Sequence, residues 1–301
     1  MNNTISPIHG PLLQCIFSTN VQKYFTTLPF NCNILTTTTS SRASSFKCRS
    51  IKHENTSESH QGFSVLKTNT QCDIGSMWSS MGFYVFSIHI PLSFGGLSAA
   101  AKILRQAVLV PQVEALLVLA IQTLELSIVL LLLKYHGKPQ YDLPDFFRAN
   151  KSSKERSWLL ASAVGFGFLL SLVFITSYIA DRWIGGTKDV NNPFLKEILS
   201  SGSTSVTACT FAYCIITPLL EEVVYRGFLL TSLASKMKWP QAVAISSIVF
   251  SVAHLSGENF LQLVIVGFVL GCSYCWTGNL SSSIAIHSLY NALILFSTFM
   301  S

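Results

Sequence analysis

From about residue 77 to its end, the chain alternates long apolar segments with short polar ones. Most of the apolar segments approach or exceed the roughly 20 residues that a membrane-spanning helix needs. The pattern predicts membrane helices at 77–101, 113–133, 157–180, 204–236, 239–256, 260–276 and 280–300. We therefore expect an all-α fold, a polytopic transmembrane bundle of about seven helices.

The composition agrees with a membrane protein. Hydrophobic residues make up 50% of the chain, charged residues only 11%, and the mean hydropathy is +0.46. An ordinary soluble domain carries about 25% charged residues. The formal net charge of +6 is small and scattered along the chain, so we expect a lipid bilayer as the surroundings and no nucleic acid as a partner.

The first seventy residues differ from the rest. Residues 1–52 contain no acidic side chain, and many of them are Ser or Thr. Such a composition is typical of an organelle transit peptide. We interpret 1–70 as a plastid transit peptide and disordered N-terminus, cleaved between residues 45 and 75, and expect a chloroplast membrane, either inner envelope or thylakoid. A disordered cytosolic tail is the alternative.

Basic residues orient the predicted helices. Lys and Arg concentrate in the segment 134–156 and recur at Lys236 and Lys238. The positive-inside rule places both segments on one side of the membrane, the stromal side in a plastid. Glu221 and His254 then both lie about 22 Å from that side along their helices. His287 reaches a similar depth only if the last helix begins below the membrane surface.

Three predicted helices carry polar side chains where hydrocarbon would surround them. A charged side chain at the bilayer centre costs about 3 kcal/mol or more unless it is paired or hydrated, so we treat these residues as functional candidates. They are Glu221, Glu222, Arg226, His254, His287 and Asn291, with the apolar Phe250, one turn before His254, as a supporting residue.

The spacing within each group suggests a role. Glu222 and Arg226 are four residues apart, so they share one helix face and can form an ion pair. Glu221 points about 100° away, free to act as a general base on water. His287 and Asn291 also share a face and could polarise a carbonyl, although an imidazole can alternatively bind a metal.

Two further pairs have simpler interpretations. Phe250 and His254 share a face, and we expect the Phe250 ring to pack beneath the imidazole. Glu125 lies in a predicted span without a motif around it. We expect it to make a structural polar contact, with Arg226 as the candidate partner.

The three motifs, in this order on consecutive apolar helices, resemble the signature of the CAAX prenyl protease and bacteriocin-processing family of intramembrane endopeptidases, and the chain is similar to its plant, plastid-targeted branch. The motifs read Glu221-Glu222-x-x-x-Arg226, Phe250-x-x-x-His254 and His287-x-x-x-Asn291. The resemblance covers about residues 200–297. It implies a catalytic core at 198–301, preceded by N-terminal membrane helices and loops at 77–197.

The resemblance also implies roles. The fold would enclose an intramembrane polar cavity in which Glu221 activates water and His254 assists. His287 and Asn291 would hold the substrate carbonyl and oxyanion, while Glu222 and Arg226 would order the helix. Family members are described both as metalloproteases and as glutamate-dependent enzymes. We favour a mechanism that requires no cofactor; if zinc is bound, its ligands would be Glu221, His254 and His287.

Two functions follow as hypotheses. The first is an intramembrane endopeptidase that acts on a membrane-associated protein or peptide. Its substrate is not expected to be a prenylated CAAX protein, because those are processed at the endoplasmic reticulum. The second is a non-proteolytic plastid membrane scaffold or chaperone that retains the protease fold.

Overall fold

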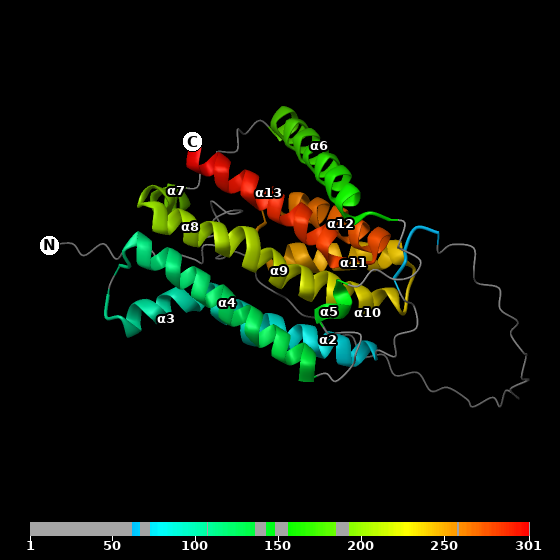
Figure 1. Cartoon of the computed structure of the whole chain (residues 1–301), viewed down its shortest axis with the longest axis horizontal. Helices are drawn as coiled ribbons and strands as arrows, with labels where there is room; N and C mark the ends of the chain where they lie inside the picture. Colours follow the sequence, from blue (N-terminus) through cyan, green and yellow to red (C-terminus); the bar gives the residue numbers. More distant parts are fainter. Residues whose placement is uncertain are drawn as a thin grey trace, which may run out of the picture.

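The computed structural model describes residues 62–66, 73–106, 108–135, 143–147, 156–184, 193–257 and 259–300. Within these ranges the chain is helical and contains no β-strand (Figure 1). The all-α prediction is therefore confirmed. Apart from residues 62–66, the predicted transit peptide lies outside the described residues.

The helices follow one another along the chain, and π-helical segments are labelled η. The first half contains α2 (Ile74–Phe83), η1 (Tyr84–His89), η2 (Pro91–Gly95), α3 (Gly96–Ile103), α4 (Pro111–Tyr135), α5 (Leu143–Phe146), α6 (Trp158–Ile184) and α7 (Pro193–Ser200). The second half contains α8 (Ser203–Phe211), η5 (Ala212–Ile216), α9 (Thr217–Glu222), η6 (Val223–Leu230), α10 (Thr231–Ala234), α11 (Trp239–Ala253), α12 (Phe260–Thr277) and α13 (Leu280–Met300).

Six helical stretches of the described chain are long and apolar enough to cross a membrane. They are Ile74–Ile103, Pro111–Tyr135, Trp158–Ile179, Ser203–Ala234, Phe260–Thr277 and Leu280–Met300. The remaining predicted span, 239–256, corresponds to α11, which is apolar but has only 15 residues. At 1.5 Å per residue it rises about 22 Å. The protein is a multi-pass helical bundle whose described part has six stretches long enough to span a membrane and, in addition, the shorter apolar helix α11.

Prolines are accommodated inside two of these stretches by π-helical turns. Pro218 has no N–H to donate to the preceding turn, and the π-helical segment η5 ends two residues before it. A second π-helical segment, η6, starts immediately after Glu222. Similarly, the helix continues through Pro91. Local π-helix is frequent at functional sites, and here it brackets the Glu221–Glu222 pair.

Close packing of α11 against α12 depends on two glycines. A Cβ atom at Gly267 would lie 3.1 Å from the Cα atom of Ser247, and one at Gly271 would lie 3.0 Å from a methyl group of Val243. Small residues allow helix backbones to approach closely in membranes. This contact brings α12 close to the helix that carries Phe250 and, at its end, His254.

At one end of the bundle, segments next to the basic residues contact one another. Arg156 donates hydrogen bonds to the backbone carbonyls of Phe63, at 2.6 Å, and Trp276, at 3.0 Å. The ring of Phe63 stacks on that of Trp239 with a centroid distance of 4.5 Å. The starts of α6 and α11 and the end of α12 therefore meet, which agrees with a common side for Arg156 and Lys238.

Helix α6 and the start of α13 differ in how far their side chains are exposed. Helix α6, drawn green at the upper edge of Figure 1, exposes large apolar side chains such as Leu160, Phe168 and Phe174, as expected of a lipid-facing helix. In contrast, α13 starts inside the bundle, where Leu280 and Ser283 are both 0% exposed. The start of the helix that carries His287 is therefore enclosed by protein.

Candidate active site

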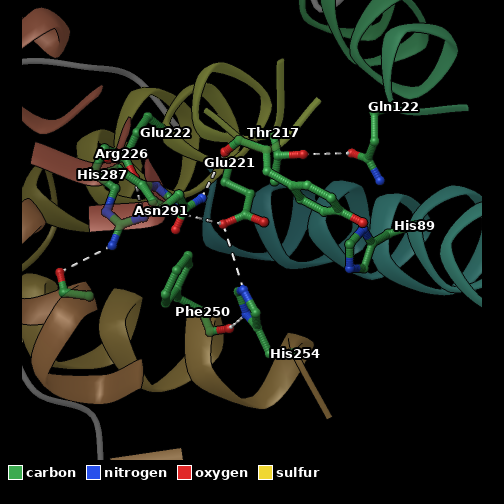
Figure 2. A network of polar contacts seen from close by, with 12 residues as sticks. His89, Gln122, Thr217, Glu221, Glu222, Arg226, Phe250, His254, His287 and Asn291 are labelled. Atoms are coloured by element: carbon green, nitrogen blue, oxygen red, sulfur yellow. Dashed lines mark hydrogen bonds and ion pairs between the residues drawn. The ribbon is translucent and has the colours of Figure 1, made fainter. Parts of the chain in front are cut away.

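The structure brings the three motifs together around Glu221 (Figure 2). The Nε2 atoms of His254 and His287 each lie 3.7 Å from Oε2 of Glu221. The carboxylate belongs to α9, while His254 caps the C-terminus of α11 and His287 lies within α13. Three helices thus direct one carboxylate and two imidazoles at a common point.

The second carboxylate of the pair makes a separate set of contacts. Oε1 of Glu222 accepts a hydrogen bond from Nη1 of Arg226 at 2.8 Å and lies 3.0 Å from Nδ1 of His287. The predicted Glu222–Arg226 ion pair is therefore present, and both side chains are 0% exposed. Glu222 does more than order its own helix, because it also binds the imidazole of α13.

Two further contacts stabilise the buried guanidinium of Arg226. Its Nη2 donates to the backbone carbonyl of Gly267 at 3.2 Å, and its guanidinium lies over the ring of Phe250 at 4.5 Å from the centroid. A cation above an aromatic face is attracted by the ring quadrupole. The Phe250 ring also contacts that of His254 at a centroid distance of 4.5 Å, as predicted. Phe250 therefore separates Arg226 from His254.

The hydrogen bonds of the two imidazoles fix which nitrogen faces Glu221. Nδ1 of His254 lies 2.7 Å from the carbonyl of Phe250, and a carbonyl can only accept. The Glu222 carboxylate likewise accepts from Nδ1 of His287. Each Nδ1 therefore carries a proton, and each ring directs its Nε2 at Glu221.

Asn291 lies one turn beyond His287 on the same helix. Its Nδ2 donates to the backbone carbonyl of Tyr213 at 2.9 Å, which ties α13 to η5. One of its two amide hydrogens is therefore already engaged. Its side-chain oxygen is buried, with no hydrogen-bond partner among the described residues.

The N-terminal helices add a polar group that the sequence analysis missed. Oε1 of Glu125 on α4 lies 2.8 Å from Nδ1 of His89 and accepts a hydrogen bond from Tyr84 at 2.9 Å. The expected contact of Glu125 with Arg226 was wrong, since Arg226 pairs with Glu222 instead. His89 is an ionisable residue in an apolar segment, the same signal that identified the other candidates.

A second residue of α4 also approaches the cluster. The hydroxyl of Thr217, four residues before Glu221, donates to Oε1 of Gln122 at 3.4 Å. In Figure 2, His89 and Gln122 lie on the side of Glu221 opposite Arg226. The described N-terminal helices therefore border the cluster.

Glu221, His254 and His287 are the three side chains of the cluster that could bind a zinc ion. Two imidazoles whose Nδ1 atoms are anchored, together with a carboxylate, are chemically suitable ligands. Within the described ranges, however, no three His, Cys, Asp or Glu side chains are grouped so that they could hold a metal ion. As arranged here, Glu221, His254 and His287 do not form a three-ligand site.

The cluster is closed to solvent. Glu221 and His287 are each 3% exposed. A cavity of about 300 Å³ lies between α2, α4 and η6, lined mainly by apolar side chains that include Val224 and Phe228. It runs beside the helix that bears Glu221 and does not include the cluster.

The fold and the cluster define a class of protein. The chain is a multi-pass helical membrane protein with a buried carboxylate facing two imidazoles from two other helices. Residues 203–293 match the Type II CAAX prenyl endopeptidase Rce1-like family. This segment contains all three motifs, so the similarity to that family lies in the part of the chain that carries the cluster.

Individual relatives are more distant. The chain is 27% identical over 138 residues to the membrane-embedded CAAX protease MroQ of Staphylococcus aureus, covering 44% of this chain and 55% of that protein. It is 27% identical over 81 residues to the putative membrane peptidase YdiL of Bacillus subtilis, covering 27% of this chain and 33% of that protein. The matches therefore span about half and a third of these relatives. No solved structure matches the chain significantly.

Proposed function

We propose that this protein is an intramembrane endopeptidase that hydrolyses a peptide bond of a membrane-associated substrate, with Glu221 as the general base. The observation that carries the proposal is the convergence of two Nε2 atoms on Oε2 of Glu221, each at 3.7 Å. That oxygen is buried and accepts no direct hydrogen bond within the described part of the chain. The membrane peptidase names of the relatives agree with this activity.

The distances suit a water molecule as the reactant. A polar contact of 3.7 Å is too long for a direct hydrogen bond and is commonly bridged by water. Such a water would donate one hydrogen to Glu221 and the other to the Nε2 lone pair of His254. Both interactions raise the electron density on the water oxygen, which then attacks the carbonyl carbon of the substrate.

His287 would stabilise the oxyanion that develops. For this role it must carry a second proton, so that Nε2–H can donate to the substrate oxygen. The Glu222 carboxylate on Nδ1 favours that imidazolium, as a buried Asp does in a Ser-His-Asp triad. Asn291 would supply a second donor through the amide hydrogen that does not bind Tyr213.

The proton balance closes within the cluster. Glu221 takes one proton from the attacking water, and the C–O bond to the substrate carbon forms. When the C–N bond breaks, the leaving amine takes that proton from Glu221. The products are a carboxylic acid and an amine, and Glu221 returns to its ionised form.

We propose that this reaction needs no tightly bound metal. The arrangement of Glu221, His254 and His287 described above supports this choice, since no three ligands among the described residues are grouped for zinc. The base, the water-orienting imidazole and the oxyanion donors are all supplied by the chain. The alternative metalloenzyme mechanism would need these three side chains to move closer together.

The proposal extends to location and substrate class. The acid-poor, Ser- and Thr-rich N-terminus supports import into a chloroplast, with the protein in the inner envelope or the thylakoid membrane. The substrate would be a membrane-associated plastid protein or peptide, and prenylation would not be required.

A direct test compares the wild-type protein with Glu221→Gln after reconstitution in lipid vesicles. Peptides released from plastid membrane proteins would be identified by mass spectrometry. We expect wild-type cleavage sites that disappear with Glu221→Gln. Identical peptide sets from both proteins would contradict the peptidase.

A scaffold function remains the second candidate, favoured by the closed state of the cluster, in which Glu221 is only 3% exposed. Expression of Glu221→Ala and His287→Ala in a line that lacks the protein separates the two functions. Full rescue by both variants supports the scaffold. Loss of rescue at normal protein abundance supports the peptidase.

A further inference from the structure

We propose that residues 62–66 form a docked strap that the functional protein retains, so that processing of the N-terminus ends before Gly62. Arg156 is the side chain that anchors this strap. Both lie outside the segment 203–293 that matches the protease family. The processing part of this inference rests on the proposed import into a chloroplast, whereas the docking part does not.

Arg156 binds two consecutive carbonyls of the strap. Its Nη2 donates to the carbonyl of Gly62 at 2.8 Å, and its Nη1 donates to that of Phe63 at 2.6 Å. The same Nη1 donates to the carbonyl of Trp276, near the end of α12, at 3.0 Å. Hydrogen bonds from a charged donor are roughly twice as strong as neutral ones. One guanidinium, with its planar fork of donors, thus joins the strap to α12.

The C-terminal end of α12 receives its partners from the strap and its anchor. The last four carbonyls of a helix lack partners within the helix. Gly278, which follows α12, binds the first of them through its N–H, and Val65 of the strap donates its N–H to the second, that of Cys275, at 2.9 Å. Arg156 binds the third, that of Trp276. Two of the four carbonyls therefore depend on residues outside the helix and its turn.

Phe63 adds aromatic contacts to these hydrogen bonds. Its ring stacks on that of Trp239 at a centroid distance of 4.5 Å and lies 5.2 Å from that of Trp276. The guanidinium of Arg156 lies over the Trp276 ring at 4.0 Å. Aromatic pairs and a cation above a ring both stabilise a contact beyond the area that it buries. Because α11 begins at Trp239, the strap ties α11 to α12.

Both helices that bring a histidine to Glu221 start at this end of the bundle. Helix α11 runs from Trp239 towards His254, and α13 starts just after α12 and carries His287. At the turn between α12 and α13, the hydroxyls of Thr277 and Ser282 lie 2.9 Å apart. The strap therefore stabilises the end of the bundle from which the two histidine-bearing helices extend.

These contacts restrict where the N-terminus can be processed. Processing hydrolyses one peptide bond with one water, releases the upstream segment as a carboxylic acid and leaves a free amine on the remaining chain. Cleavage at a bond between Gly62 and residue 73 would detach at least one group that binds Arg156 or α12. Cleavage before Gly62 keeps all of them. The sequence alone allowed cleavage up to residue 75, and docking of the strap excludes the later part of that window.

The first measurement is chymotrypsin cleavage of the full-length protein in lipid nanodiscs, with the bond after Phe63 followed by mass spectrometry. Arg156→Lys keeps the charge but loses the planar fork that binds two carbonyls at once. We expect it to raise the rate of cleavage about tenfold. Arg182→Lys is the matched control, because Arg182 is exposed in the last turn of α6, the helix that starts just after Arg156.

The comparison of the two lysine variants decides the docking. Equal rates in Arg156→Lys and Arg182→Lys, whether raised or unchanged, would overturn the strap. Hydrogen–deuterium exchange of the same proteins shows whether each is folded, since amides within α4 should exchange as in wild type. If Arg156→Lys does not fold, Phe63→Ala replaces it, with exchange of residues 62–66 as the readout. Exchange of these residues at the wild-type rate in Phe63→Ala would also contradict docking.

The second measurement is the first residue of the protein isolated from chloroplasts, mapped by mass spectrometry of N-terminal peptides. We expect a first residue at or before Gly62. A first residue between 63 and 75 would overturn the inference. An intact N-terminus would contradict the transit peptide while the strap is still retained, so failure of the chloroplast proposal is distinguishable from failure of the strap.

Discussion

Glu222 holds His287 in place across the bundle: Oε1 of the carboxylate lies 3.0 Å from Nδ1 of an imidazole 65 residues further along the chain. The same oxygen accepts a hydrogen bond from Nη1 of Arg226. The two carboxylates of the Glu221–Glu222 pair therefore have different tasks. Glu222 anchors a cation and a ring, while Glu221 is left for a reactant.

This arrangement predicts different effects for single and double substitutions at the anchor. Glu222→Gln leaves the buried guanidinium of Arg226 without its counter-ion, so we expect a loss of about 3–5 kcal/mol in stability. Adding Arg226→Met should recover much of that loss, because no buried charge remains. Thermal unfolding in detergent would measure both effects.

In the double variant, recovered stability should not be accompanied by recovered activity. The double variant still lacks the carboxylate that supports a protonated His287, so its kcat should stay low. A double variant with recovered stability and wild-type kcat would contradict the role assigned to Glu222.

Glu221→Gln should separate activity from stability in the opposite way. Loss of a general base typically lowers the rate about 10²–10⁴-fold. The substitution also removes a buried charge whose nearest ionisable partner atoms in the described chain lie 3.7 Å away. We therefore expect kcat to collapse while the unfolding temperature is unchanged or raised. The control Glu114→Gln, at another buried carboxylate on α4, should leave kcat unchanged. Residual cleavage above a tenth of wild type would exclude Glu221 as the base.

The contact of α11 with α12 predicts a difference between two glycines. In Gly267→Ala the new methyl group would lie 3.1 Å from both Cα and Cβ of Ser247, which forces the helices apart. We expect a loss of about 1–3 kcal/mol, together with lower activity, since the carbonyl of Gly267 also binds Arg226. Gly167→Ala in α6 is the control, because a Cβ there meets no atom within 4 Å.

Metal content gives a further test. For the mechanism proposed above, purified active protein should contain far less than one zinc per chain, and prolonged treatment with a chelator should leave kcat unchanged. Elemental analysis by mass spectrometry measures the first quantity. Stoichiometric zinc that is lost together with activity would show that the three side chains close around a metal.

The sequence predicted much of the contact between the three motifs because helical spacing is set locally along the chain. Spacings of four residues place Glu222 with Arg226 and Phe250 with His254 on shared helix faces, whatever the rest of the fold does. The order of the apolar segments and the basic ends then brought Glu221 and His254 to one depth. The structure shows the contacts of Glu222 with Arg226 and of Phe250 with His254, and it brings Glu221 and His254 together.

The missed features depend on contacts between distant segments. His89 and Glu125 are 36 residues apart, so no helical spacing connects them. The length of α11 was also overestimated, because residues up to 256 remain largely apolar. The helix stops at Ala253 since the His254 side chain takes the carbonyl of Phe250 and Leu255 turns left-handed. Neither event is visible in hydropathy.

The shortness of α11 bears on how water reaches a reaction inside a membrane. The hydrocarbon core is about 30 Å thick, whereas this helix rises only about 22 Å. Either the bilayer thins beside α11, or the non-helical residues after Ala253 remain below its far surface, where they must be enclosed by protein or wetted. Where the bilayer thins or these residues are wetted, the barrier between His254 and the opposite aqueous phase is thinner than the full hydrocarbon core. The supply of water and the release of polar products would then take a shorter route than the full depth of the bilayer.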